Sequence, residues 1–347
     1  MEAWIHSFVS ELHGLLLVGV IIVMIGSLGK SADWLVSEVV VLSQRSGLPK
    51  VVIGATIVSI GTTLPEAAVS VLAALKGQPT LALGNAVGSI ICDTGLILGL
   101  SCLISPLPLL RSMVNRQGWL QITSGFLLVV CCIPVAAWSR PDLLLEQGGR
   151  MPQLMGFFFV FLLFGYLGIS IYWATRLEES GITEEVSEVA ASSMTTIILK
   201  VITAIVLIVA SSWVLIPAVE EAAIRLHIPK GIIAATLVAF GTSLPELVTA
   251  TTAAWKGHGD LAVGNVIGAD ILNVLFVAGV AAAVTPAGLA APPDFFRVLF
   301  PSMLGVLIVF RVGVMFSGDR LQRPFGAILF VTYFVAMILS YATLTES

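Results

Sequence analysis

Two six-residue stretches decide the fold: Gly-Thr-Thr-Leu-Pro-Glu at residues 61–66 and Gly-Thr-Ser-Leu-Pro-Glu at residues 241–246. Both lie inside long apolar runs. Proline has no backbone N–H and clashes with the preceding turn, so a helix has to bend or break at Pro65 and at Pro245. Backbone carbonyls of the turn before each proline then lose their partners. Free carbonyls beside the glutamate that follows each proline indicate a cation site.

These stretches belong to an internal duplication. Residues 49–99 align without a gap with residues 229–279, so that each position recurs 180 positions later, and 22 of the 51 aligned positions are identical. Compositional bias would reproduce Leu, Val and Ala, but Asn85 also recurs in register as Asn265, and the Pro-Glu pairs recur with it. The chain therefore contains two copies of one structural unit.

The composition places the chain in a lipid bilayer. Hydrophobic residues make up 57% and charged residues 11% of the chain, with a mean hydropathy of +1.03, whereas soluble domains have about 25% charged residues. Runs of about 20 apolar residues are long enough to cross a bilayer. The sequence predicts an all-α integral membrane protein with ten transmembrane helices, near residues 14–42, 49–75, 80–105, 118–138, 153–175, 195–224, 229–255, 261–285, 295–316 and 324–344.

Five spans in each copy are an odd number, so the second copy enters the membrane from the opposite side, which gives two inverted five-helix repeats. We expect a first repeat over residues 1–175, an acidic cytoplasmic linker over 176–194 and a second repeat over 195–347. With both termini outside, ten Lys and Arg residues fall on the inner side and six on the outer side, as the positive-inside rule requires. We therefore expect a multi-pass plasma-membrane protein with both termini extracellular or periplasmic.

The charge pattern excludes nucleic acid as a partner. The net charge is −4, and no basic stripe is present. The acidic residues between the repeats are typical of a solvated linker. We expect no cofactor and no obligate protein partner.

Oxygen-bearing side chains accompany the two glutamates. An ionised glutamate near the bilayer centre costs about 2.5 to 3.5 kcal/mol on insertion scales, so Glu66 and Glu246 need partners. A helical turn brings Thr62 and Glu66 to one face, and Thr242 lies in the same relation to Glu246. Ca²⁺ takes six to eight oxygen ligands. A divalent cation shared by the two glutamates would supply the missing partner.

The next span of each copy carries polar residues at four-residue spacing, which places them on one stripe that we expect to face the broken helices. The stripe consists of Asn85, Ser89 and Asp93 in the first copy and of Asn265, Ala269 and Asn273 in the second. Asp270 lies off this stripe, and its counterpart in the first copy is Ile90. The sequence leaves two interpretations open for Asp270: a supporting partner of the site, or a residue with no assigned role.

At these residues the chain resembles a known family. The segments GTTLPEAAVS with GNAVGSIICD, and GTSLPELVTA with GNVIGADILN, are similar to the two alpha repeats of the calcium/cation antiporter superfamily, in particular of prokaryotic sodium/calcium exchangers. The likeness is strong over these paired segments and extends to the remaining chain by span count. It implies a secondary active antiporter, not an enzyme, that exchanges Ca²⁺ for Na⁺ by alternating access and serves calcium homeostasis.

The resemblance also implies roles for individual residues. Ca²⁺ would be bound by Glu66 and Glu246 together with Thr62 and Thr242. The coupling ion, Na⁺ or H⁺, would be bound by Ser89, Asp93 and Asn273 and by carbonyls near Ser59 and Ala239. Supporting polar residues would be Asn85, Asn265, Thr63, Ser243 and Asp270. The long first helices of the two repeats, near residues 14–42 and 195–224, would slide to open either face of the membrane.

Two departures leave the counter-ion open. Prokaryotic exchangers usually have Asn in the first repeat and Asp in the second at the central polar pair, whereas this chain has Asp93 first and Asn273 second. Where a serine is common in the second repeat, this chain has Ala269. Protonation can neutralise a buried carboxylate pair, so a Ca²⁺/H⁺ exchanger is the main alternative.

Two further classes compete with an exchanger. The paired carboxylates would suit an intramembrane hydrolase, but the sequence offers no nucleophile–base set and no HExxH motif. An ion channel is disfavoured because a single charged midplane site suits occlusion better than the weak multi-site binding that conduction needs.

Overall fold

The apolar runs form helices in the computed structural model, which describes residues 2–138, 140, 142–178, 193–226 and 241–346. Seven of the described helices are long and apolar enough to cross a membrane, and a bent helix pair makes up to eight spans. The chain is thus a helical, multi-pass membrane protein.

The helices of the first half run from the N-terminus to the end of the first repeat. They are α1 (Glu2–Glu11), α2 (Gly14–Ser46), α3 (Lys50–Ile53), η1 (Gly54–Val58), α4 (Ser59–Thr62), α5 (Leu64–Leu75), α6 (Pro79–Ile90), η2 (Ile91–Ile97), α7 (Leu98–Ile104), α8 (Arg111–Cys132), η3 (Val135–Trp138), α9 (Asp142–Glu146) and α10 (Gln153–Glu178).

The described helices of the second half follow the same order from their long first helix onward. They are α11 (Met194–Arg225), α14 (Leu244–Trp255), α15 (Gly259–Leu272), η5 (Asn273–Ala278), α16 (Gly279–Ala283), η6 (Phe295–Leu299), α17 (Phe300–Phe316) and α18 (Arg323–Glu346). The first part of the span expected at 229–255 lies outside the described residues, as does most of the linker expected at 176–194.

The predicted spans differ from the structure in two regions. The span expected at 118–138 begins earlier and ends earlier, at Arg111 and Cys132. The polar residues before position 118 did not suggest a membrane helix, but Gln117 and, within the predicted span, Gln121 are buried in the protein interior. The first helix, α1, was not predicted. It buries Ile5 and Val9 against the N-terminal part of α2 and against α11.

Four short strands also lie outside the all-α prediction. β1 (Leu107–Pro108) pairs with β4 (Arg320–Leu321), and β2 (Gly149–Met151) pairs with β3 (Leu289–Ala291), both antiparallel. Each pair joins a connection of the first half to a connection of the second. Segments of two or three residues are too short to show a strand pattern in the sequence.

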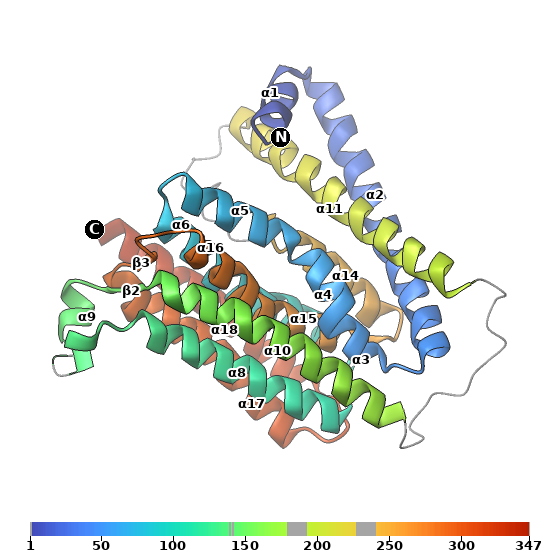
Figure 1. Ribbon diagram of the computed structural model, residues 1–347. Coiled ribbons are helices and arrows are strands. Elements are labelled where there is room, and N and C mark those ends of the chain that lie inside the picture. The colour runs from blue at the N-terminus through green and yellow to red at the C-terminus, as the bar shows by residue number, and fades with distance from the viewer. Residues whose placement is uncertain (1, 139, 141, 179–192, 227–240, 347) are drawn as a thin grey trace.

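The long helices α2 and α11 lie side by side (Figure 1) and pack against α1 and α14. Polar contacts join them: the hydroxyls of Ser27 and Ser211 are 2.8 Å apart, and the Lys200 ammonium lies 3.1 Å from the Glu38 carboxylate. On the opposite side of the molecule, α8, α10, α17 and α18 run close together (Figure 1). The broken helices and α15 lie between these two groups.

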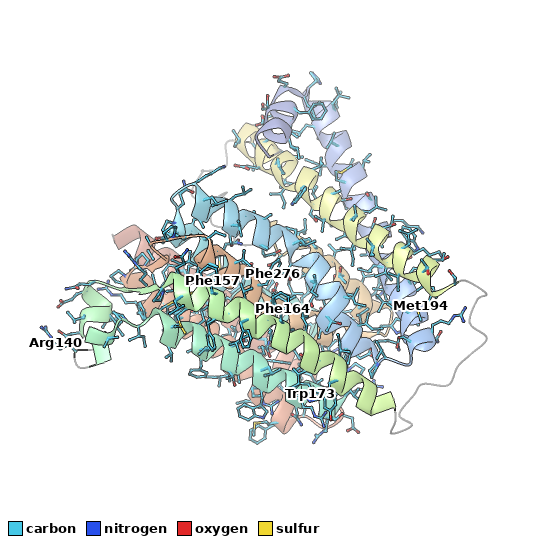
Figure 2. The ribbon with its side chains drawn as sticks, in the orientation of Figure 1. Arg140, Phe157, Phe164, Trp173, Met194 and Phe276 are labelled. Atoms are coloured by element: carbon cyan, nitrogen blue, oxygen red, sulfur yellow. The ribbon has the colours of Figure 1, made fainter. Side chains whose placement is uncertain are left out.

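Large apolar side chains cover the outer surface, as expected for helices that contact lipid. Figure 2 shows Phe157, Phe164 and Trp173 along the length of α10, and the first two are 56% and 69% exposed. On α2, Leu15 is 80% exposed. Such a surface would be unstable in water but is stable against the hydrocarbon chains of a lipid bilayer.

The proline breaks occur where the sequence predicts them. The helix from Lys50 ends at Thr62 and resumes at Leu64, with a bend of 43° between the two parts. Pro65 sits in the first turn of α5, where a missing N–H leaves no helical bond unmade. Pro245 occupies the same position in α14.

Two glycines on α15 let the backbones of three elements approach closely. A Cβ atom at Gly264 would lie 2.1 Å from the carbonyl oxygen of Val51 in α3, and one at Gly268 would lie 2.5 Å from that of Ala55 in η1. Both contacts are with backbone, which cannot turn aside as a side chain can. Small residues of this kind are typical of close helix packing in membranes.

Replacing Gly264 with alanine should therefore destabilise the protein by about 1 to 3 kcal/mol, the usual cost of overpacking a well-packed core. The measurement is the apparent unfolding temperature of purified protein in detergent. The control is Gly305→Ala on α17, where no described atom lies within 4 Å of the added methyl group. An unfolding temperature for Gly264→Ala equal to or above that of the control would contradict this packing.

Candidate cation site

The candidate site lies where the two proline breaks meet the two most buried helices. Glu66 is in the first turn of α5, and Glu246 is in the first turn of α14. Asp93 comes from η2 and Asn273 begins η5. All four side chains are at most 1% exposed. The position of each glutamate next to a helix N-terminus is favourable for a negative charge.

Each glutamate accepts a hydrogen bond from the motif of the other repeat. The Thr63 hydroxyl donates to Oε1 of Glu246 at 3.3 Å, and the Ser243 hydroxyl donates to Oε1 of Glu66 at 3.4 Å. Thr63 and Ser243 are equivalent positions of the duplication, as are the two glutamates. We refer to these two bonds as the crossed pair. The crossed pair holds both carboxylates at the junction of the two copies.

A second contact joins equivalent positions directly. The Asn273 amide donates to Oδ2 of Asp93 at 3.3 Å, and these two residues are 180 positions apart. Both lie in segments where the helix widens to a π-helical turn. Such turns inside α-helices are frequent at functional sites because they re-aim side chains.

Asn85 links the polar stripe to both motifs. Its amide nitrogen donates to the backbone carbonyl of Glu66 at 3.3 Å and to the Ser70 hydroxyl at 3.0 Å. Its amide oxygen accepts from the Thr242 hydroxyl at 3.3 Å. Asn85 thereby fixes the start of α5 relative to the start of α14.

The site is rich in buried oxygens that lack a protein partner. Among the described residues, these are Glu66 Oε2, Ser89 Oγ, Asp93 Oδ1, Glu246 Oε2, Asn265 Oδ1 and Asn273 Oδ1. Buried polar atoms are nearly always hydrogen-bonded, so such a cluster needs a physical reason. The ion pairs of the described part of the chain lie elsewhere and include none of these carboxylates.

The donor set suits a hard cation. No three Asp, Glu, His or Cys side chains among the described residues converge closely enough to hold a metal ion without other ligands. A cation at this point would therefore need hydroxyl, amide and backbone oxygens beside the carboxylates. Ca²⁺ accepts such mixed oxygen sets.

Comparison with known proteins identifies the family. The model of the family described as "Sodium/calcium exchanger protein" matches residues 16–172 and 196–342. The chain belongs to the sodium/calcium exchanger protein family. It is 32% identical over 320 residues to inner membrane protein YrbG of Escherichia coli (strain K12), covering 88% of this chain and 93% of that protein.

Other relatives of this exchanger family agree in length and in fold. Sodium/calcium exchanger MaX1 of Methanosarcina acetivorans is 27% identical over 356 residues, covering 94% of this chain and 97% of that protein. The structure of the sodium-calcium exchanger NCX_Mj soaked with zero Na⁺ and Ca²⁺ matches with a TM-score of 0.78 at 24% identity, covering 94% of this chain and 99% of that chain. The last likeness shows a common fold.

The exchanger chain brings together most of the residues singled out in its sequence, but not with the expected partners. The four-residue spacing suggested that Thr62 would face Glu66; in the structure its hydroxyl lies near the Glu246 carboxylate instead. The break at Thr63 interrupts the helical turn and turns this hydroxyl toward the other copy. The Ser59 hydroxyl bonds the Thr56 carbonyl within its own helix at 3.2 Å. Ala239 lies outside the described residues.

Three polar side chains near the site of this exchanger were missed in the sequence. Ser70 accepts from Asn85, and Thr94 and Gln121 both contact Asp270. Gln121 lies on α8, which belongs to neither pair of motif helices. A lone glutamine in an apolar span was the available signal, but nothing in the sequence indicates which helix it faces.

The Asp93–Asn273 pair predicts a specific stability pattern. Asn273→Asp would place two carboxylates at hydrogen-bonding distance in a buried place, and an uncompensated buried charge costs about 3 to 5 kcal/mol. The apparent unfolding temperature at mildly alkaline pH and without divalent cations should fall in this variant. The swapped double variant Asp93→Asn/Asn273→Asp restores one acid and one amide and should recover. A swap as unstable as Asn273→Asp alone would show that the two positions are not equivalent.

Proposed function

We propose that this protein is a secondary active antiporter that exchanges Ca²⁺ for Na⁺ across the plasma membrane. The observation that carries the proposal is the crossed pair: two buried glutamates from equivalent motifs, each with one oxygen that has no partner among the described residues. A divalent cation between the two free oxygens would balance both charges. Ca²⁺ and Na⁺ are cargo here, and no cofactor is required.

The ligand assignment follows from the donors at this junction. Glu66 and Glu246 supply charge, and Thr62 and Thr242 supply oxygens at the ends of the broken helices. Na⁺ would use Ser89, Asp93 and Asn273, together with carbonyls near Ser59 and Ala239. The buried Ser89 hydroxyl and the free oxygens of Asp93 and Asn273 support this second set, since they have no partner among the described side chains.

The proposed architecture is ten transmembrane helices in two inverted five-helix repeats, over residues 1–175 and 195–347 with the linker 176–194 between them. The two parts of the family match, 16–172 and 196–342, are consistent with this division. Both termini would lie outside the cell membrane. In the first repeat α8 is counted as the fourth span, although it is less apolar than the others, and α10 is counted as the fifth.

Transport would proceed by alternating access. The pair α2 and α11 is joined by polar contacts. It packs against α14, which carries Glu246, and Lys256 at the end of α14 forms an ion pair with Asp33 of α2 at 2.7 Å. A shift of this pair relative to the site helices would expose the site to one face and then to the other. Occupancy by Ca²⁺ or by monovalent ions, but not both, would couple the two fluxes.

One observation favours a second counter-ion. Ala269 supplies no hydroxyl at its position of the stripe, so one oxygen ligand for Na⁺ is missing. Protons need no such ligand shell, and a Ca²⁺/H⁺ exchanger is therefore the alternative. An intramembrane hydrolase is disfavoured, since two of the relatives are named as an exchanger and a putative antiporter.

Radiolabelled Ca²⁺ uptake into proteoliposomes tests the proposal. Uptake should depend on an outward Na⁺ gradient and should be abolished in Glu66→Gln and in Glu246→Gln, because each removes one of the two charges that bind the cation. The matched control is Glu146→Gln on the peripheral helix α9, an exposed glutamate whose loss should leave uptake unchanged.

Parallel vesicles with only a pH gradient separate the counter-ions. Uptake driven by the pH gradient alone would show that the coupling ion is H⁺ and not Na⁺. Uptake that needs neither gradient, or that persists in both glutamine variants, would contradict the proposed exchange at this site.

A further inference from the structure

A buried polar cluster around one further carboxylate, Asp270, lies beside the cation site and takes no part in the crossed pair. Asp270 of α15 accepts hydrogen bonds from the Thr94 hydroxyl of η2 and from the Gln121 amide of α8, the latter at 2.6 Å. The Gln121 amide also reaches the Thr94 hydroxyl at 3.2 Å. Asp270 is 1% exposed and Thr94 is fully buried. The three residues come from three different elements.

This cluster departs from the symmetry of the rest of the site. The counterpart of Asp270 in the first copy is Ile90, and the counterpart of Thr94 in the second copy is Val274. The duplication therefore does not explain a fourth buried carboxylate. Its two hydrogen-bond partners, Thr94 and Gln121, are uncharged and do not compensate a negative charge on the carboxylate.

The two oxygens of Asp270 have different surroundings. Both donors, from Thr94 and Gln121, end on Oδ2. The other oxygen, Oδ1, is buried and has no partner among the described residues. A carboxylic acid fits this pattern: its carbonyl oxygen accepts the two hydrogen bonds, and its second oxygen carries the proton.

A bound metal ion fits less well. Alkali and alkaline-earth ions need several oxygen ligands, whereas the Gln121 group that faces Asp270 is an N–H donor. Both hydrogens that approach Oδ2 would repel a cation placed there. A proton needs one oxygen only, and Oδ1 supplies it.

We propose that Asp270 is a proton-binding site, distinct from the crossed pair, and that its carboxyl group holds a proton on Oδ1. An ionised aspartate in an apolar interior is costly unless it is paired, and protonation is the usual way to avoid this cost. The geometry of the Thr94 and Gln121 contacts then defines where the proton resides.

The charged and titratable groups around α15 do not offer a cationic partner to Asp270. Arg111 of α8 bonds carbonyl groups at Ser317 and Gly318, and Arg116 of α8 stacks on Trp173. The other such groups on the elements around α15 are Lys50, Glu66, Cys92, Asp93, Cys102, Cys131, Cys132 and Glu246. Lys50 lies at the start of α3, while Asp270 is near the end of α15.

The proton site affects the cation site through charge. Asp93 and Asp270 lie within electrostatic range of each other. Release of the proton would add a negative charge beside Asp93 and strengthen cation binding, so that the apparent Ca²⁺ affinity would rise as the pH rises. This consequence, unlike the proton site itself, rests on the proposed exchange function.

Infrared difference spectroscopy of the purified full-length protein, titrated with acid and base, tests the proton site directly. The wild type should show the carbonyl stretching band of a buried carboxylic acid, and Asp270→Asn should lose one component of it. The matched control is Asp260→Asn, at the half-buried start of the same helix, which should keep every component. If Asp270→Asn does not fold, Gln121→Leu removes one donor to Oδ2 and should shift the same component.

The outcomes are decisive in either direction. Loss or shift of that component in the Asp270 or Gln121 variant supports the proposal. A spectrum with no component that responds to either variant overturns it, as does a component that appears only after Na⁺ or Ca²⁺ is removed, since a metal ion would then occupy the place of the proton.

Transport assays measure the coupling separately. Asp270→Asn imitates the protonated group, so it should retain Ca²⁺ uptake at acidic pH and lose the increase in apparent Ca²⁺ affinity at alkaline pH. If neither protein transports Ca²⁺, the proposed function fails while the infrared result still stands. A lower Ca²⁺ affinity of Asp270→Asn at every pH would show an ionised Asp270 and contradict the proton site.

Discussion

The structure depends on one constraint: negative charge buried in a protein that is itself surrounded by lipid. Glu66 and Glu246 are almost completely excluded from solvent, and each accepts a hydrogen bond from a hydroxyl of the motif in the other repeat. Neutral hydrogen bonds cannot offset the desolvation of two carboxylates so close together. In the proposed function a cation between them would remove the conflict, and the broken helices would supply its remaining oxygens. This dependence on a cation would also allow two different ions to compete for one place.

The same constraint explains why the interior is so closely packed. The glycines of α15 bring its backbone against α3 and η1, and this contact fixes the distance between the first motif and the helix that carries Asp270 and Asn273. A looser fit would admit water, which would raise the local dielectric constant and weaken the attraction between the carboxylates and a cation.

Much of this arrangement could be predicted from the sequence. The duplication, the two proline breaks and the spans near α2, α10, α11 and α18 follow from periodic apolar runs and from residues that recur in register. The nearness of the two glutamates was also expected, because equivalent positions of two inverted copies would meet at their common axis. Crossed bonds between Thr63 and Glu246, and between Ser243 and Glu66, were not predictable, since four-residue spacing favoured contacts within each helix.

Other features required the three-dimensional structure. The π-helical turns at Asp93 and Asn273 change the direction of these side chains, and no residue pattern marks them. The counterpart of Asp270 in the first copy is the apolar Ile90, so the duplication gave no information about its role. Its partner Gln121 lies on α8, whose contacts with α15 no sequence pattern marks. Sequence patterns report which face of a helix is polar, but they do not report which neighbouring helix meets that face.

The most direct test of the central claim is isothermal titration calorimetry of the purified protein with Ca²⁺. The account predicts saturable binding in the wild type that is weakened by added Na⁺ and lost in both Glu66→Gln and Glu246→Gln. Because a single cation is shared by the two carboxylates, each substitution alone should be sufficient. Saturable Ca²⁺ binding that survives in the double variant Glu66→Gln/Glu246→Gln would contradict the account.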